Sequence, residues 1–379
     1  MKNIIFYYDD LNGSGGAPGE IRQFIKACTE CFDGNVSVIY RKKWSIFNVP
    51  NIFHLLKRRK DSQVILFKFS SLSNIYLSLI CKLYGIDYSI VPLWQVSSFL
   101  DWDNPFEKNV IPTAGNDYKN KAKLGRSTFG KKNFLSYFRY FKRLTYRKTF
   151  GFFMLKFAKY VFVFSEFEKS EIDKLLGNNN FIYRFIRFEC SIENRLIGSD
   201  RFSKSNGTLK ITFWGRLDYY YKGIDKICNE ILRIKDQSLN FKIYLIGPDY
   251  NESYRLVNDF ITKNSLYNNL EIISDYERGT LGYLADSDYS IVVPRWDGYV
   301  RSIKESILLG VPVIVNKETN HDKTIQELDC GYLIDPDTLG DFLVQLCKVN
   351  THKINITTDK SVEYFSSKAC ALDFLHAFK

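Results

Sequence analysis

The sequence predicts an α/β protein built from two doubly wound parallel sheets. Short apolar runs alternate with amphipathic segments of helical length, a pattern typical of parallel strands joined by crossover helices. The alternation occurs in two series, separated by the polar, Ser- and Gly-containing residues 198–209. A chain of 379 residues also exceeds what one ordinary hydrophobic core holds. We therefore expect two domains with a cleft between them, at the carboxyl ends of the strands.

The first series begins with a buried strand, a glycine-rich turn over residues 9–19 and then a helix. This order of elements is typical of a phosphate-binding site. Glycines allow the backbone to approach a phosphate closely, and a helix N-terminus favours a bound anion. The signal is weak alone, since neither G-x-G-x-x-G nor a Walker lysine is present. The expected strands are 3–8, 36–40, 63–67, 88–91, 160–165 and 181–188, and the helices are 20–31, 74–84 and 166–176.

The second series follows the polar segment and repeats the alternation. Its strands end in glycines, at Gly215 and Gly247, which favours tight turns into the loops that follow. A last amphipathic helix is expected over residues 362–378. The expected strands are 210–214, 241–246, 270–273, 289–293, 312–315 and 332–334, and the other helices are 223–235, 252–264, 280–286, 302–310 and 339–349.

Residues 291–316 contain the most informative pattern, which is strand, loop, helix, turn and strand. Asp297 lies on the loop and Glu305 inside the helix, and Gly310 can supply a left-handed helix end. This spacing can aim both carboxylates at one small polar ligand above the helix N-terminus.

The net charge of +11 is concentrated in one segment. Residues 119–159 contain 13 Lys or Arg and no Asp or Glu, interleaved with Phe and Tyr. A basic, aromatic, partly amphipathic helix is typical of a surface that binds anionic membranes. A nucleic-acid patch and a solvated helix with aromatics in the core are the alternatives, and the aromatic excess and the motifs below disfavour nucleic acid. The membrane patch is expected at Arg139, Lys142, Arg143 and Arg147.

Other residue classes narrow the possibilities. The eight cysteines are scattered and are expected to be free thiols in a reducing compartment, and the four histidines show no metal-ligand spacing. No run of 18 apolar residues exists, and the acidic residues near the N-terminus disfavour a signal peptide. We expect a cytoplasmic protein, peripheral on the inner face of the membrane.

Four ordered landmarks resemble retaining glycosyltransferases of family 4 (glycosyl transferases group 1). The resemblance is dense over residues 160–337 and looser before them. It implies the GT-B fold, in which two Rossmann-like domains face a central cleft. On this basis the domains are 1–199 for the acceptor and 206–357 for the nucleotide-sugar, with 358–379 crossing back to the first domain. The landmarks are VFVFSEFEKSEI from Val161, FWGRLDYYYKGID from Phe213, PRWDGYVRSIKESILLGVPVIV from Pro294 and GYLIDPD from Gly331.

The resemblance also implies roles for single residues. Arg216 and Lys222 match the pair that holds the donor diphosphate, where two cations can neutralise the leaving phosphate. Glu305 matches the glutamate that accepts the ribose hydroxyls, and Asp297 matches the acid that lies against the donor sugar. Further donor-binding residues are expected at Gly15, Gly16, Gly215, Gly247, Ser274, Gly298, Tyr299, Val300 and Arg301.

The sequence departs from the family pattern at three places. Asp297 stands where the family has glutamate, which shortens the reach by about 1.5 Å. Val300 stands where a second glycine is common, so the loop conformation is open. Trp94 and Gln95 follow a strand after which many members carry a histidine, and Gln95 can donate or accept a hydrogen bond but cannot act as a base. We place these two residues on the acceptor side.

The function that follows is that of a retaining glycosyltransferase, which moves a sugar from a UDP- or GDP-sugar donor to a lipid-linked or glycan acceptor in the synthesis of O-antigen, capsule or exopolysaccharide. We expect no cofactor and no divalent metal, and we interpret the Asp-x-Asp triplets at 101–103, 286–288 and 335–337 as turns and caps. The alternatives are a GT-B nucleotide-sugar 2-epimerase and a non-catalytic sugar-nucleotide-binding or membrane scaffold protein.

Overall fold

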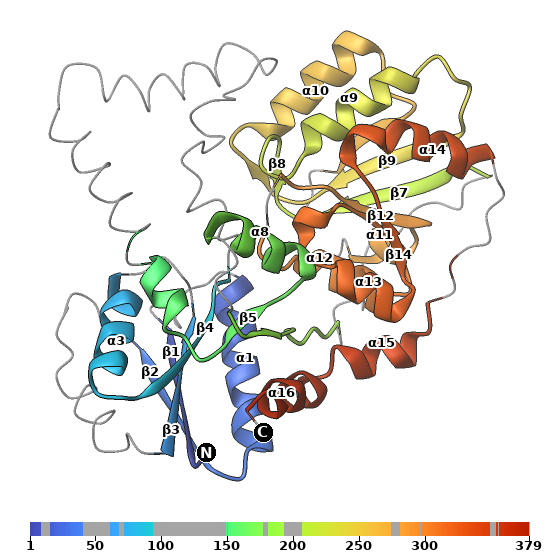
Figure 1. The fold of residues 1–379 in the computed structure, drawn as a ribbon. Coiled ribbons are helices and arrows are strands. Elements are labelled where there is room, and N and C mark those ends of the chain that lie inside the picture. Colours follow the sequence, from blue (N-terminus) through green and yellow to red (C-terminus); the bar gives the residue numbers. More distant parts are fainter. Residues whose placement is uncertain are drawn as a thin grey trace, which may run out of the picture.

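The protein folds into two α/β domains, each built on a parallel sheet (Figure 1). The structure is a computed structural model, and it describes residues 1–8, 16–40, 61–67, 72–93, 149, 151–176, 181–192, 207–273, 281–295, 297–348, 354 and 356–378. Within these ranges each domain has one six-stranded sheet, with the orders β2-β1-β3-β4-β5-β6 and β11-β9-β7-β12-β13-β14. A short parallel pair, β10 and β8, lies beside the second sheet. The predicted fold class is confirmed.

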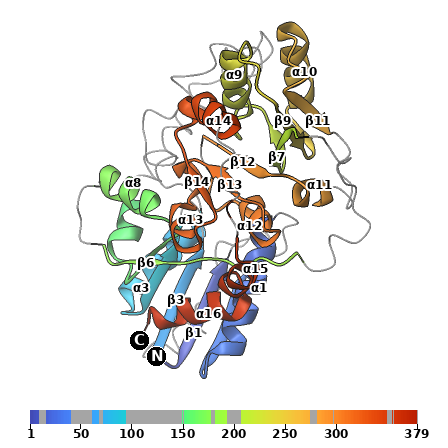
Figure 2. The same ribbon diagram turned by 90° about the vertical axis from the view of Figure 1, so that its right-hand side faces the viewer.

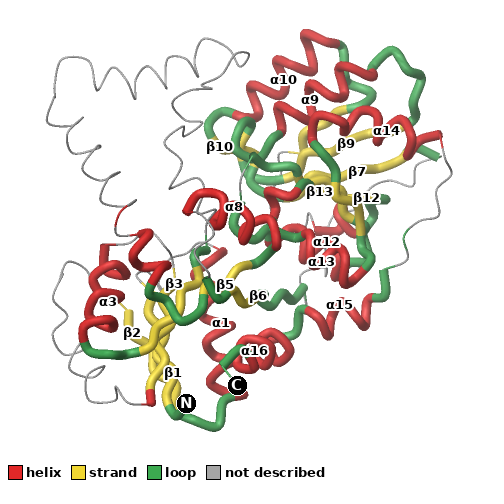
Figure 3. The backbone as a smooth tube through the Cα atoms, in the orientation of Figure 1, coloured by secondary structure: helices red, strands yellow, loops and turns green. Residues whose placement is uncertain are grey.

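The first domain follows the predicted order of elements (Figure 3). Its elements are β1 (Asn3–Tyr8), α1 (Gly16–Cys31), β2 (Asn35–Tyr40), β3 (Ser62–Phe67), α3 (Leu72–Leu83), β4 (Asp87–Val91), β5 (Val161–Val163), α8 (Glu166–Leu176) and β6 (Tyr183–Phe185).

The second domain contains the site-bearing strands, and two helices follow it at the end of the chain. Its elements are β7 (Leu209–Trp214), β8 (Leu217–Asp218), α9 (Ile224–Ile234), β9 (Phe241–Ile246), β10 (Asp249–Tyr250), α10 (Ser253–Asn264), β11 (Leu270–Ile273), α11 (Leu281–Ala285), β12 (Tyr289–Val292), α12 (Arg301–Leu308), β13 (Val313–Val315), η2 (Lys317–Thr319), α13 (Asp322–Leu328), β14 (Gly331–Leu333), η3 (Pro336–Thr338) and α14 (Leu339–Lys348). The two helices that follow are α15 (Thr358–Tyr364) and α16 (Ser367–His376).

Strand β1 shows why the strands are almost continuously apolar. Ile5 and Tyr7 pack in the core on one face of the sheet. Ile4 and Phe6 pack in the core on the other face. Because helices cover both faces of a parallel sheet, positions 4–8 of this strand are all buried, and each carries an apolar or aromatic side chain.

The C-terminal segment differs from the single helix expected over residues 362–378. Two helices, α15 and α16, replace it, because Ser366 is extended (φ −68°, ψ 146°) and its hydroxyl accepts a hydrogen bond from the backbone N–H of Ala369 at 3.2 Å. The break lets Phe365 pack in the second domain while Phe374 packs in the first, 4.9 Å from the ring of Phe162. Figure 2 shows α15 descending from the second domain to α16, which lies beside α1 and near both termini.

Several predicted boundaries also change. Helix α1 begins at Gly16 rather than residue 20, with Pro18 in its first turn, where a missing N–H is harmless. Strand β6 covers only Tyr183–Phe185 of the expected 181–188. The eight cysteines all lie within the described ranges and are free, as predicted. No helix in those ranges is long and apolar enough to cross a membrane.

Candidate active site

The predicted site residues of the second domain gather where its central strands end. Strands β7 and β12 are neighbours, so Gly215–Arg216 after β7 and the loop after β12 emerge at the same edge. Gly215 and Gly247 have φ values of 140° and 149°, and a Cβ on Gly247 would lie 1.8 Å from the carbonyl oxygen of Gly215. These two glycines therefore allow the ends of β7 and β9 to approach closely.

Arg216 supplies a cation at this edge. Its side chain is exposed, and its guanidinium lies 4.4 Å from the centre of the Tyr250 ring. An arginine held against an aromatic face keeps its planar donors directed outward, which suits a phosphate.

Lys222 and Asp297 form an ion pair, although sequence reasoning assigned one to phosphate and the other to sugar. The second oxygen of Asp297 accepts a hydrogen bond from the backbone N–H of Gly298 at 2.8 Å. The two side chains are 16% and 17% exposed, so both remain reachable from the solvent. Their pairing defines one polar centre on the loop after β12.

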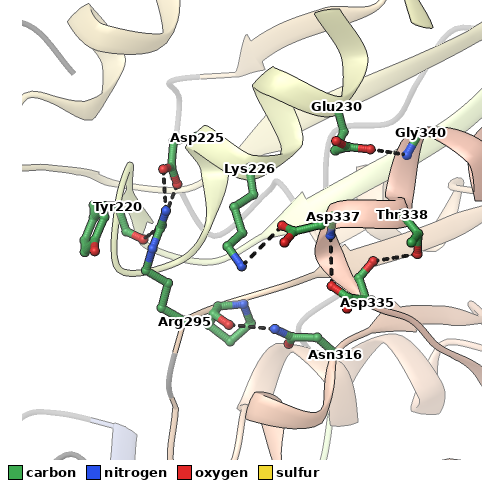
Figure 4. A network of polar contacts seen from close by, with 11 residues as sticks. Tyr220, Asp225, Lys226, Glu230, Arg295, Asn316, Asp335, Asp337, Thr338 and Gly340 are labelled. Carbon is green, nitrogen blue, oxygen red and sulfur yellow. Dashed lines mark hydrogen bonds and ion pairs between the residues drawn. The ribbon is translucent and has the colours of Figure 1, made fainter. Parts of the chain in front are cut away.

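A bidentate ion pair supports the loop that carries Lys222 (Figure 4). The two guanidinium nitrogens of Arg295 each lie 2.6 Å from a carboxylate oxygen of Asp225. The same guanidinium donates to the carbonyl of Tyr220 at 2.5 Å and covers the Tyr220 ring at 3.7 Å. Arg295 thereby ties the segment after β12 to the turn before α9, and fixes the spacing between Lys222 and Asp297.

Glu305 is nearly buried, with 4% of its side chain exposed. One carboxylate oxygen accepts a hydrogen bond from the indole N–H of Trp214 at 2.9 Å, and the other accepts from Nε of Arg301 at 3.0 Å. Sequence reasoning missed Trp214. The available signal was a tryptophan inside a buried strand, because a buried indole N–H needs an acceptor.

The loop before α12 adopts a conformation that explains Val300. Val300 is extended (φ −76°, ψ 117°), so the position does not need glycine. A glycine is needed two residues earlier, since a Cβ on Gly298 would lie 2.5 Å from the carbonyl oxygen of Leu93 in the first domain. The ring of Tyr299 is stacked between Phe164 at 4.7 Å and His321 at 4.1 Å, so its backbone is the part left to contact a ligand.

Asn320 secures the same loop and was also missed by the sequence reasoning. Its amide donates to the carbonyls of Asp297 and Gly298 at 2.9 and 2.8 Å. Its side-chain oxygen accepts from the hydroxyl of Ser165 in the first domain at 2.6 Å. The left-handed φ of 59° at Asn320 is tolerated by asparagine and directs the side chain toward the loop.

Some predicted positions lie outside the described residues. Two Asp-x-Asp triplets can be followed, and one aspartate of each has a structural role: Asp288 accepts the backbone N–H of Lys210 at 2.9 Å, and Asp335 caps η3. The predicted positions outside the described ranges are Gly15, Trp94, Gln95, Ser274, Arg139, Lys142, Arg143 and Arg147, together with the triplet at 101–103.

Two doubly wound parallel-sheet domains, with a polar centre at the strand ends of the second, fit the GT-B class. Residues 208–350, which cover most of the second domain, match the family model described as Glycosyl transferases group 1. A comparison with curated proteins finds no match.

Solved structures with the same fold cover both domains. Sucrose-phosphate synthase from Thermosynechococcus elongatus is similar with a TM-score of 0.63 and 13% identity, over 100% of this chain and 98% of that chain. The lipopolysaccharide outer core galactosyltransferase WaaB gives 0.62 and 14%, over 100% and 99%. Anabaena HepE in complex with UDP-glucose gives 0.61 and 12%, over 100% and 99%. At these identities the likeness shows the GT-B fold.

Proposed function

We propose that the protein is a retaining glycosyltransferase that moves a sugar from a UDP- or GDP-sugar to a lipid-linked glycan acceptor in surface-polysaccharide synthesis. The observation that carries the proposal is the convergence of Arg216, the Lys222–Asp297 pair and Glu305 at one edge of the glycosyltransferase domain. Two cations and two carboxylates at this edge match the groups of a sugar nucleotide.

Each part of such a donor has a partner. Lys222 has three donors, so it can hold Asp297 and a phosphate oxygen together. Arg216 adds a second cation for the diphosphate. Glu305 accepts from Trp214 and Arg301, and a carboxylate, with two lone pairs on each oxygen, can also accept from the hydroxyls of a ribose.

The chemistry needs no strong base. The bond between C1 of the sugar and the phosphate oxygen breaks, and its electron pair stays on the phosphate. The acceptor hydroxyl bonds to C1 on the same face and gives its proton to the departing phosphate. Arg216 and Lys222 stabilise the negative charge that develops on that phosphate.

The names of similar structures support the donor class. HepE is described in complex with UDP-glucose, and WaaB is described as a galactosyltransferase. From these names we infer that this protein also uses a nucleotide-sugar donor, and we assign no particular sugar to it.

Donor hydrolysis tests the proposal. We expect Glu305→Ala and Lys222→Ala each to lower turnover of UDP- or GDP-sugars at least 100-fold, while Lys242→Ala leaves it unchanged. Lys242 is a matched control because it also forms an ion pair within this domain, with Glu271 on β11. We expect EDTA to have no effect. Turnover that survives both site changes would refute the assignment. An epimerised nucleotide-sugar product would favour the 2-epimerase, and binding without turnover would favour the scaffold.

An apolar patch on the first domain supports an acceptor at a membrane surface. Leu79 and Leu83 on α3 and Phe153 and Phe157 line one shallow groove, and they are 39–80% exposed. Lys82 lies in the same groove, with its ammonium 4.6 Å from the centre of the Phe157 ring. Exposed aromatics beside lysines suit the interface of an anionic bilayer.

Flotation with vesicles of phosphatidylglycerol and phosphatidylcholine tests this part. We expect Phe153→Ser/Phe157→Ser to reduce the bound fraction at least fivefold, as should neutralising the four predicted basic residues at 139–147. Tyr267→Ser is the control, because Tyr267 is 57% exposed on the second domain. Flotation equal to wild type in both test variants would remove the membrane partner from the proposal.

A further inference from the structure

A buried ion pair joins the two domains directly beside Glu305. Lys304 is fully buried, and its ammonium lies 2.9 Å from the carboxylate of Glu20, whose side chain is 7% exposed. Glu20 belongs to α1 of the first domain, whereas Lys304 precedes Glu305 on α12 of the second. The pair therefore crosses the domain interface at the helix that carries the proposed ribose-binding carboxylate.

Glu20 also approaches a second cation on the same helix. Arg301 precedes Lys304 by one helical turn, so the two side chains lie on one face of α12. Its guanidinium lies 4.0 Å from Glu20 and donates to Glu305 at 3.0 Å. One carboxylate of the first domain thus faces both cations that flank Glu305.

Desolvation makes this contact sensitive to either partner. A buried ammonium needs a counter-charge, because the low-dielectric interior does not replace water. The remaining contacts of Lys304 are weaker, a carbonyl oxygen of Glu189 at 3.4 Å and the face of the Tyr299 ring at 5.0 Å. The Glu189 carboxylate also interacts electrostatically with Lys304 and Arg301, but Glu20 is the carboxylate that hydrogen-bonds Lys304. We therefore expect loss of the Glu20 charge to shift Lys304 and α12.

The other end of the same segment is also held by the first domain. Gly298 packs against Leu93, and Tyr299 stacks on Phe164. The segment from Asp297 to Glu305 is therefore anchored to the first domain at its loop end and at its helix end. Its geometry depends on residues that belong to the other domain.

We propose that Glu20 is a positioning residue for the donor site, which fixes Lys304 and Arg301 across the domain interface and through them the Glu305 carboxylate. This inference rests on the proposed function, since it assumes that Glu305 binds the nucleotide. Glu20 itself need not touch the donor. The first domain then completes the nucleotide site of the second.

The test compares nucleotide affinity with fold stability in the full-length protein. We expect Glu20→Gln to weaken binding of UDP or GDP at least 10-fold by calorimetry, and to raise the KM for the donor sugar nucleotide. Lys304→Met should weaken binding on its own, and adding it to Glu20→Gln should cause less than a threefold further loss, because both changes break one contact. The double variant carries no buried unpaired lysine, so it remains testable if Glu20→Gln alone fails to fold.

Asp373→Asn is the matched control. It removes an ion pair with Arg187 that includes no residue of α12, and should lower the melting temperature without changing nucleotide affinity. Folded Glu20→Gln protein, or a folded double variant, with wild-type affinity and KM would overturn the inference and leave the proposed function standing. Wild-type protein that binds neither UDP nor GDP would overturn both.

Discussion

His321 provides a pH-dependent test of the loop that carries the site. It is fully buried, and its Nε2 contacts the carbonyl of Val300 at 3.0 Å, so the neutral ring must donate from that nitrogen. Among the described residues, no group hydrogen-bonds to its Nδ1. Burial and the nearby charge of Lys304 lower the pKa of His321 to about 3 from an ordinary value of 6.5.

The sign follows from proton binding. Between these two pKa values the unfolded chain binds a proton at His321 and the folded protein does not, so stability falls as the pH decreases from 6.5 toward 3. From the two pKa values, this one group costs about 2 kcal/mol of unfolding free energy between about pH 7.5 and about pH 5.

Urea unfolding at these two pH values measures the effect. We expect wild-type protein to lose about 2 kcal/mol more than His321→Gln over this interval, because other titrating groups contribute equally to both. His376→Gln is the control for replacing a histidine as such, since His376 is exposed on α16. An identical pH dependence in wild type and His321→Gln would refute the reasoning.

Three further changes test the packing around the site. Gly298→Ala places a Cβ 2.5 Å from the carbonyl oxygen of Leu93, so we expect at least a 10-fold lower initial rate of donor hydrolysis; an unchanged rate would contradict the close approach. Arg295→Lys loses the bidentate pair with Asp225, and urea titration should show a loss of about 1–3 kcal/mol, whereas no loss would mean that the pair is replaced. Burial raises the pKa of Glu168 to about 8 from 4.5, so its contribution to stability is lost as the pH rises through this window. Glu168→Gln should therefore unfold at a higher urea concentration than wild type at pH 8.5, and an equal midpoint would contradict the shift.

Element order could be predicted because it depends on local pattern. Each apolar run and each helical period records which positions are buried, and the strand at Asn3–Tyr8 and the helix at Glu166–Leu176 were predicted with their observed limits. The break at Ser366 could not be predicted in this way, because the two helices that it separates pack in different domains. A periodic pattern shows that a helix has an apolar face, but it does not show in which domain's hydrophobic core that face is buried.

The same distinction between local pattern and tertiary packing applies to the candidate site. Arg216, Lys222, Asp297 and Glu305 were identified from motifs, and their roles toward a donor stay predictions. Their partners within the protein were not identified. Asn320, for example, contacts the loop only because the chain after β13 returns to it.

The sequence by itself determined the two doubly wound domains and the polar residues that follow their strands. Both can be predicted because buried strands and turns have characteristic residues within short segments of the chain. The tertiary structure decided which of those residues meet. Lys222 pairs with Asp297, and Glu20 pairs with Lys304 although they are far apart in the chain. The physical reason is that a buried charged side chain such as Lys304 needs an opposite charge close to it. Whether one is close depends on how the two domains pack together.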